Sequence, residues 1–180
     1  MMTFARAAAI ALVSLASTGA WSQQGVTKTE ITLGSIQDLS GPLAGYGKQI
    51  RMGMLLRIDE LHEQGGVNGR KIKLIVEDSA YDPRKAALAA QKLVNQDKVF
   101  MMVGSLGTAQ NIAAMPIQFE KNVINFFPVT AAREMYEPFH RLKYSYAATY
   151  YDGIRGTLPK MIKEKGSKKV CIIYRSEEHT

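Results

Sequence analysis

Cysteine and tryptophan are the scarcest residues of this 180-residue chain, which has one of each. A lone cysteine, Cys171, forms no internal disulfide and excludes a cysteine-rich metal site. Charged residues make up 22% of the chain and apolar residues 46%, which is typical of a globular domain and unlike disordered or coiled-coil chains. The net charge of +7 is spread along the sequence, whereas nucleic-acid binding favours one dense basic stripe. We therefore expect no nucleic-acid partner.

The chain also lacks an apolar run of the about 20 residues that a membrane-spanning helix needs. Its longest apolar run, residues 7–16, follows Arg6, and Ala20 and Ser22 are small residues placed at −3 and −1 of a cleavage site. This pattern predicts a secretory signal peptide over residues 1–22, cut before Gln23. No cysteine lies near the cut, so we expect no lipid anchor.

Motifs for nucleotide and catalytic chemistry are missing as well. Residues 41–49 (GPLAGYGKQ) carry five residues between the outer glycines, where a P-loop needs four, and Gln49 replaces the hydroxyl residue that binds magnesium. No dinucleotide-binding glycine pattern follows the first expected strand. None of the three histidines has a metal-ligand partner four residues later. We expect no catalytic residue, no metal and no cofactor.

Short aliphatic runs alternate with segments of helical period along the remaining chain. This alternation predicts an α/β fold with a doubly wound parallel sheet. The wholly apolar runs at 99–103 and 123–127 predict burial on both faces of that sheet. Strands are expected at 30–37, 71–77, 99–103, 123–127, 144–147 and 169–174, and helices at 45–63, from Asp82-Pro83 through Val94, 108–120 and 152–165.

Ligands of open parallel sheets bind beyond the carboxyl ends of the strands. Three loops meet that description: residues 38–42 with the following Tyr46, residues 104–108, and residues 128–131. Thr108 opens a predicted helix, whose free N–H groups favour a carboxylate or a phosphate. Thr130 could offer a second hydroxyl to the same anion. The alternative is that Thr108 only caps its helix.

Several other chemically active residues have plain structural interpretations. Cys171 lies in an apolar run, where a buried thiol is expected. The neighbouring carboxylates Glu77 and Asp78 end a predicted strand and are expected to form a solvated edge. A cluster of tyrosines is expected either to pack in the core or to form an aromatic wall over a ligand; it comprises Tyr144, Tyr146, Tyr150 and Tyr151.

Four motifs, in matching order and spacing, carry a resemblance to a known family. They are residues 39–47 (LSGPLAGYG), the turn 65–69 (GGVNG), the helix start Tyr81-Asp82-Pro83, and the loop 103–108 (VGSLGT). Together they resemble the branched-chain amino acid (Leu/Ile/Val) periplasmic binding proteins of ABC transporters, within the type I solute-binding family. The similarity covers about residues 26–174.

The resemblance implies a non-enzymatic, monomeric periplasmic receptor that closes two α/β lobes on an amino acid and presents it to a membrane permease. The ligand carboxylate is then expected on Leu106, Gly107 and Thr108. The ammonium group is expected on Val129, Thr130 and Ala131. Tyr46 and Tyr150 are expected to line the pocket.

The sequence departs from the family in two respects. Some members carry a disulfide where this chain has Tyr81 and residues near Gly107. Family members are also roughly twice as long, so we expect residues 23–149 to form most of the first lobe, with apolar surface left open, and 150–174 to begin the second. Residues 175–180 are expected to be an artefactual tail.

Three other functions stay open on the sequence alone. The same fold could serve as a receptor for an amide or urea-type solute, or as a periplasmic sensory domain. A secreted enzyme would need a catalytic pair in the second lobe. Fold does not separate these functions.

Overall fold

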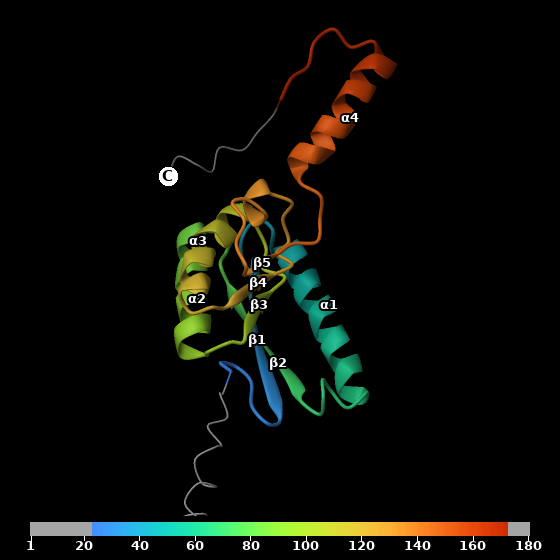
Figure 1. Ribbon diagram of the computed structural model, residues 1–180. Coiled ribbons are helices and arrows are strands. Elements are labelled where there is room, and N and C mark those ends of the chain that lie inside the picture. Colours follow the sequence, from blue (N-terminus) through green and yellow to red (C-terminus); the bar gives the residue numbers. More distant parts are fainter. Residues whose placement is uncertain (1–22, 173–180) are drawn as a thin grey trace, which may run out of the picture.

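The computed structural model describes residues 23–172. Its centre is a parallel sheet of five strands in the order β2-β1-β3-β4-β5. Helix α1 covers one face, and α2 and α3 cover the other (Figure 1). The doubly wound α/β sheet predicted from the sequence is confirmed. The strands are β1 (Glu30–Gln37), β2 (Lys71–Asp78), β3 (Met101–Val103), β4 (Ile124–Phe126) and β5 (Lys143–Tyr144); the helices are α1 (Ala44–Glu63), α2 (Pro83–Gln91), α3 (Thr108–Glu120) and α4 (Tyr150–Lys165).

Most predicted elements are present at nearly the predicted bounds, because period and capping signals agree there. The Asp82 side chain accepts hydrogen bonds from the N–H groups of Arg84 and Lys85, and Pro83 occupies the first turn of α2, as the N-cap and proline rules anticipate. Beyond Gln91 the helix widens into a π-helical turn, η1 (Lys92–Gln96). The strand expected at 144–147 is wrong in its bounds, since β5 is the two-residue segment Lys143–Tyr144.

The core lies between the sheet and the α2/α3 layer. Ala86 and Ala90 of α2 are fully buried, and their small side chains let the helix approach the strands closely. The larger core residues around them are Ile36, Leu93, Val94, Val99, Met102 and Val123. Burying each of these side chains stabilises the fold by about 1.5–3 kcal/mol relative to exposure.

The α1 face of the sheet is covered loosely, contrary to the expected burial on both faces. In β3 and β4 only the middle residues, Met102 and Asn125, are fully buried. An apolar gap of about 320 Å³ lies between α1 and the strands, lined in part by Leu33, Met54 and Leu74. Helix α1 itself buries only Gly47. The expectation of open apolar surface on this lobe therefore agrees with the structure.

Helix α4 leaves the sheet and runs away from the other helices (Figure 1), and none of its residues is buried. The strand predicted from residue 169 is wrong as far as residue 172, because those residues take no regular structure. Cys171 is consequently exposed, not buried in a strand as expected. The predicted signal peptide (1–22) and the tail 175–180 lie outside the described residues. Within 23–172, no helix combines the length and the apolar character needed to cross a bilayer.

Candidate ligand-binding site

The candidate site lies where the chain order reverses along the sheet. Strand β1 pairs with β2 on one side and with β3 on the other, so the loops after β1 and β3 diverge to opposite faces. A crevice at the carboxyl ends of the strands is the expected result of such a reversal. The three loops predicted from the sequence all reach this point.

Two carboxylates hold the first loop in place: Asp38, which is buried, and Asp78, which is the last residue of β2. The side chain of Asp38, fully buried, accepts the N–H groups of Gly41 and Leu43, both at 2.6 Å. Asp78 accepts the N–H groups of Leu39 and Ala80, both at 2.8 Å, and the Ser40 hydroxyl at 2.6 Å. Asp78 therefore has a structural role that the expected solvated edge did not include.

The charge of Asp78 is favoured by these bonds. Burial acts to raise the pKa of its carboxyl, but the Ser40 hydroxyl and the backbone N–H groups together hold that pKa below its ordinary value. The first loop is thus fastened to the end of β2 by an ionised group. This fastening places Leu43 and Tyr46 at the rim of the crevice.

The second loop ends at the N-terminus of α3. Gly107, at φ +102°, is the N-cap, and no side chain caps the helix. The side chain of Asn111 donates to the carbonyl oxygens of Ser105 and Gly107, at 3.0 and 2.6 Å. Thr108 is therefore the first helical residue, and the interpretation that it only caps the helix is wrong. Its hydroxyl is available for another partner.

That partner comes from the third loop. The Oγ1 atoms of Thr108 and Thr130 lie 2.7 Å apart. Leu106 and Val129 pair as in a parallel sheet just behind them, which holds the two loops in register. Thr130 Oγ1 also accepts the Ala132 N–H at 3.2 Å. Two hydroxyls thus converge beside the N–H groups of the first turn of α3, which have no partner within the helix.

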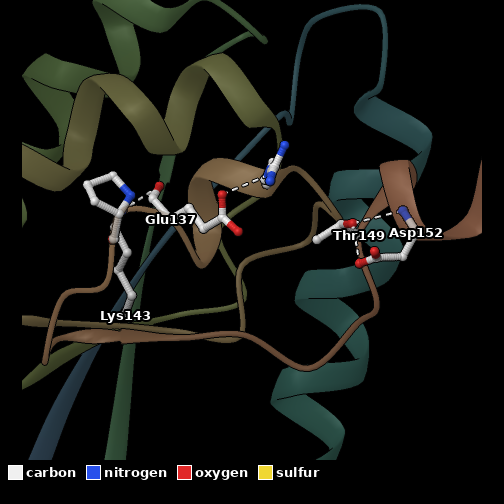
Figure 2. Close-up of polar contacts among 6 residues, drawn as sticks. Glu137, Lys143, Thr149 and Asp152 are labelled. Carbon is white, nitrogen blue, oxygen red and sulfur yellow. Dashed lines mark hydrogen bonds and ion pairs between the residues drawn. The ribbon is translucent and has the colours of Figure 1, made fainter. Parts of the chain in front are cut away.

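The start of α4 is tied to the third loop. The Tyr150 N–H donates to the Ala131 carbonyl at 2.9 Å. Thr149 caps α4 by accepting the Asp152 N–H, and Figure 2 shows this cap beside the segment that carries Glu137 and Lys143. In that segment Arg133 pairs with Glu137 at 2.7 Å, and Lys143 donates to the Glu137 carbonyl. The ring of Tyr150 is thereby placed at the crevice.

These parts enclose one cavity of about 230 Å³. Of the eight residues predicted to bind a ligand, seven line it; Ala131 does not, although its carbonyl positions Tyr150. Sequence reasoning missed two lining residues. Leu43 and Tyr81 stand inside the motifs 39–47 and Tyr81-Asp82-Pro83, but those motifs indicate a loop and a helix start and do not show that these two side chains reach the site. The lining is Leu43, Tyr46, Tyr81, Leu106, Gly107, Thr108, Val129, Thr130 and Tyr150.

The chemistry of the cavity is that of binding. None of the lining residues carries a charge, and the polar groups are hydroxyls and the positive end of α3. Such an arrangement favours a small anionic group next to an apolar or aromatic one. Among residues 23–172 no group of three histidine, cysteine or acidic side chains gathers as a metal site would require.

The remaining residues considered from the sequence lie elsewhere. Of the tyrosine cluster only Tyr150 lines the cavity, and all four members are exposed rather than packed in the core. His62 Nε2 accepts the Ile72 N–H at 2.9 Å, and His140 stacks on Phe119. Glu77 forms an ion pair with Lys92 of η1 and does not line the cavity. His179 lies outside the described residues.

Known proteins are similar to this chain in sequence and in fold. The family described as periplasmic binding protein matches residues 30–179. A Pseudomonas aeruginosa leucine-, isoleucine-, valine-, threonine- and alanine-binding protein is 28% identical over 78% of this chain and 37% of its own length. The chain spans less than half the length of the curated relatives that it matches.

Solved structures give the same result for the fold. A possible leucine/isoleucine/valine-binding protein from Rhodopirellula baltica aligns with a TM-score of 0.71 and 27% identity, over 78% of this chain and 37% of its own. A fatty acid ABC transporter substrate-binding protein from Thermomonospora curvata aligns with a TM-score of 0.73 and 27% identity, over 81% and 36%. The partial lobe described above is common to both.

Proposed function

Because the chain belongs to the periplasmic binding protein family, we propose that it is the ligand-binding part of an extracytoplasmic receptor of an ABC importer. Its ligand is a branched-chain or closely related amino acid, held at the crevice of this lobe and covered by a second one. The receptor releases that ligand to a membrane permease and catalyses no reaction. Residues 150–172 begin the connection to the second lobe.

The observation that carries the proposal is the convergence of Thr108 and Thr130 at the N-terminus of α3. A carboxylate placed there can accept hydrogen bonds from the Thr108 hydroxyl and from the free N–H groups of the first helical turn. The apolar and aromatic lining suits a short aliphatic side chain. The Val129 and Thr130 side of the cavity faces the remaining part of such a ligand and is assigned to its ammonium end.

Names of the relatives support the same ligand class, since several are described as binding leucine, isoleucine and valine. The fatty acid transporter protein shows that a similar fold also serves an apolar carboxylate. The two classes differ by the ammonium group. An experiment that compares them therefore tests the proposal directly.

The test is isothermal titration calorimetry of the full-length protein with L-leucine, and with 4-methylpentanoate, which keeps the carboxylate and the side chain but lacks the ammonium. We expect L-leucine to bind and 4-methylpentanoate to bind at least ~10-fold more weakly. Equal affinity would replace the amino-acid proposal with a carboxylate receptor. Thermal shifts with a panel of short amides cover the remaining ligand class, and an amide that binds while leucine does not would overturn the proposal.

A further inference from the structure

Tyr81 is the cavity residue whose backbone is most constrained. It has φ +60°, directly after Ala80 at φ +48°. The left-handed region is unfavourable for a residue with a Cβ, and such conformations persist only where neighbouring contacts hold them. Two successive residues in this region, at the rim of a ligand cavity, need specific contacts to keep them there.

Those contacts come from both sides of Tyr81. Asp78 accepts the Ala80 N–H at 2.8 Å, and Ser79 accepts the Asp82 N–H at 2.8 Å. From α3, the Gln110 Nε2 donates to the Tyr81 carbonyl at 2.6 Å. Gln110 is only 2% exposed, and this partly buried bond joins the start of α2 to the start of α3.

Gly107 leaves the space that the Tyr81 ring uses. A Cβ added at Gly107 would lie 3.0 Å from the Tyr81 Cε2 atom and far inside contact distance of the Gln110 amide. Only a residue without a side chain fits at this place. Tyr81 and Gly107 both line the cavity, and the ring therefore forms its wall on the α2 side, next to the N-terminus of α3.

Gln110 carries a further sign of a positioning role. Its Oε1 atom is buried and has no hydrogen-bond partner. A buried amide oxygen without a partner destabilises the folded state. The bond from Nε2 to the Tyr81 carbonyl is therefore the hydrogen bond that fixes the orientation of the Gln110 amide.

We propose that Tyr81 determines ligand size in this cavity, and that Gln110 is the positioning residue that holds the Tyr81 ring against Gly107. The ring shortens the space beside the carboxylate end, which selects a branched aliphatic ligand over an aromatic one. This inference rests on the proposed function for the identity of the ligand. The position of the Tyr81 ring, in contrast, follows from its contacts and is independent of the proposed function.

The selectivity test compares L-leucine and L-phenylalanine by calorimetry on the full-length protein. Tyr81→Ala is expected to lower the preference for leucine by ~10-fold or more, since one or more methylene-sized changes in an apolar pocket alter selectivity by about 10- to 200-fold. Tyr81→Phe keeps the ring and is expected to keep the preference. An unchanged preference in Tyr81→Ala overturns the selectivity role.

The positioning test uses Gln110→Met, which keeps the length of the side chain and removes its donor. We expect the same direction of change as in Tyr81→Ala. The matched control is Gln118→Met on the same helix, because Gln118 is also fully buried but its side-chain amide makes no hydrogen bond to Tyr81. A merely structural effect would lower the melting temperature in both variants and change the preference in neither.

A second readout works without ligand. In 3-fluorotyrosine-labelled protein, the Tyr81 fluorine resonance is assigned by its loss in Tyr81→Phe. We expect this resonance to move in Gln110→Met and to stay in Gln118→Met; no movement in Gln110→Met overturns the positioning role. If leucine and phenylalanine both fail to bind the wild-type protein, the proposed function fails and the selectivity role fails with it, while the fluorine spectrum still decides the positioning role.

Discussion

The hydroxyl oxygens of Thr108 and Thr130 lie 2.7 Å apart, although the two residues are 22 positions apart in the chain. Their contact depends on the parallel pairing of β3 with β4 and on the bridge between Leu106 and Val129 behind them. The pair lies at the N-terminus of α3, where the N–H groups of the first turn have no partner within the helix. This geometry yields a direct prediction about binding.

Thr108→Val and Thr130→Val each keep a β-branched side chain and remove one hydroxyl. A hydrogen bond to a charged group contributes about 1.5–3 kcal/mol, so we expect each variant to bind L-leucine roughly 10- to 150-fold more weakly. Calorimetry measures the loss. Thr157→Val is the control, since its hydroxyl bonds within exposed helix α4. Wild-type affinity in both site variants would remove the hydroxyl pair from the binding site.

Gly47 allows α1 to begin against the first loop. A Cβ at this position would overlap the Asp38 carbonyl group, whereas a Cβ at Gly45 or Gly53 would meet nothing within 4 Å. We expect Gly47→Ala to lower the free energy of unfolding by about 1–3 kcal/mol. Gly53→Ala should instead raise it by about 0.5–1 kcal/mol. Urea denaturation compares the two, and equal effects would show that the Asp38 contact is unimportant.

The carboxylate of Asp78 predicts a dependence of stability on pH. Its folded-state pKa is lower than the ordinary value of 3.8, so its ionised form stabilises the fold. That contribution is fully present above about pH 5, which is about one unit above the ordinary value, and it is lost as the pH falls through the lowered pKa. Asp78→Asn should therefore be less stable than wild type at pH 7, with the gap closing below pH 4.

The measurement is a series of urea denaturation curves from pH 7 to pH 3. Asp59→Asn serves as the control, because Asp59 is an exposed carboxylate on α1, away from the loops. A gap between Asp78→Asn and wild type that stays constant over this range would contradict the prediction.

A contact outside the core joins α4 to the segment that follows β4. The Arg133 guanidinium lies 5.2 Å from the centre of the Tyr151 ring, and Arg133 also forms an ion pair with Glu137. Exposed cation–π contacts contribute about 0.5–1 kcal/mol. We expect Arg133→Gln and Tyr151→Leu to speed hydrogen exchange of the Tyr150 N–H, which bonds to Ala131, by about 2- to 5-fold.

Tyr151→Phe retains an aromatic ring and should exchange at the wild-type rate. Arg155→Gln removes an exposed cation of the same helix and should also leave the rate unchanged. Exchange would be followed by NMR on the ligand-free protein. Equal rates in all four variants would show that the ring contact does not orient α4.

Some expectations failed for a common reason. The two apolar runs predicted to be buried on both sheet faces are covered fully on only one, and the run at residue 169 forms no strand as far as residue 172. An apolar run in the sequence indicates only that the segment can be buried. Whether it is buried depends on a partner, and the described part of the chain supplies none for α4 or for much of the α1 face.

The sequence by itself determined the α/β alternation, the start of α2 at Asp82-Pro83, the helix over 108–120 and the three loops of the crevice. These features follow from local periodicity, from capping and from the rule that parallel strands end at one edge. The tertiary structure alone decided the rest: that Gly107 and not Thr108 caps α3, that Asp78 fastens the first loop, and that Tyr81 enters the cavity. Each of these depends on which strands pair and how closely two backbones approach, and no local pattern in the chain encodes that distance.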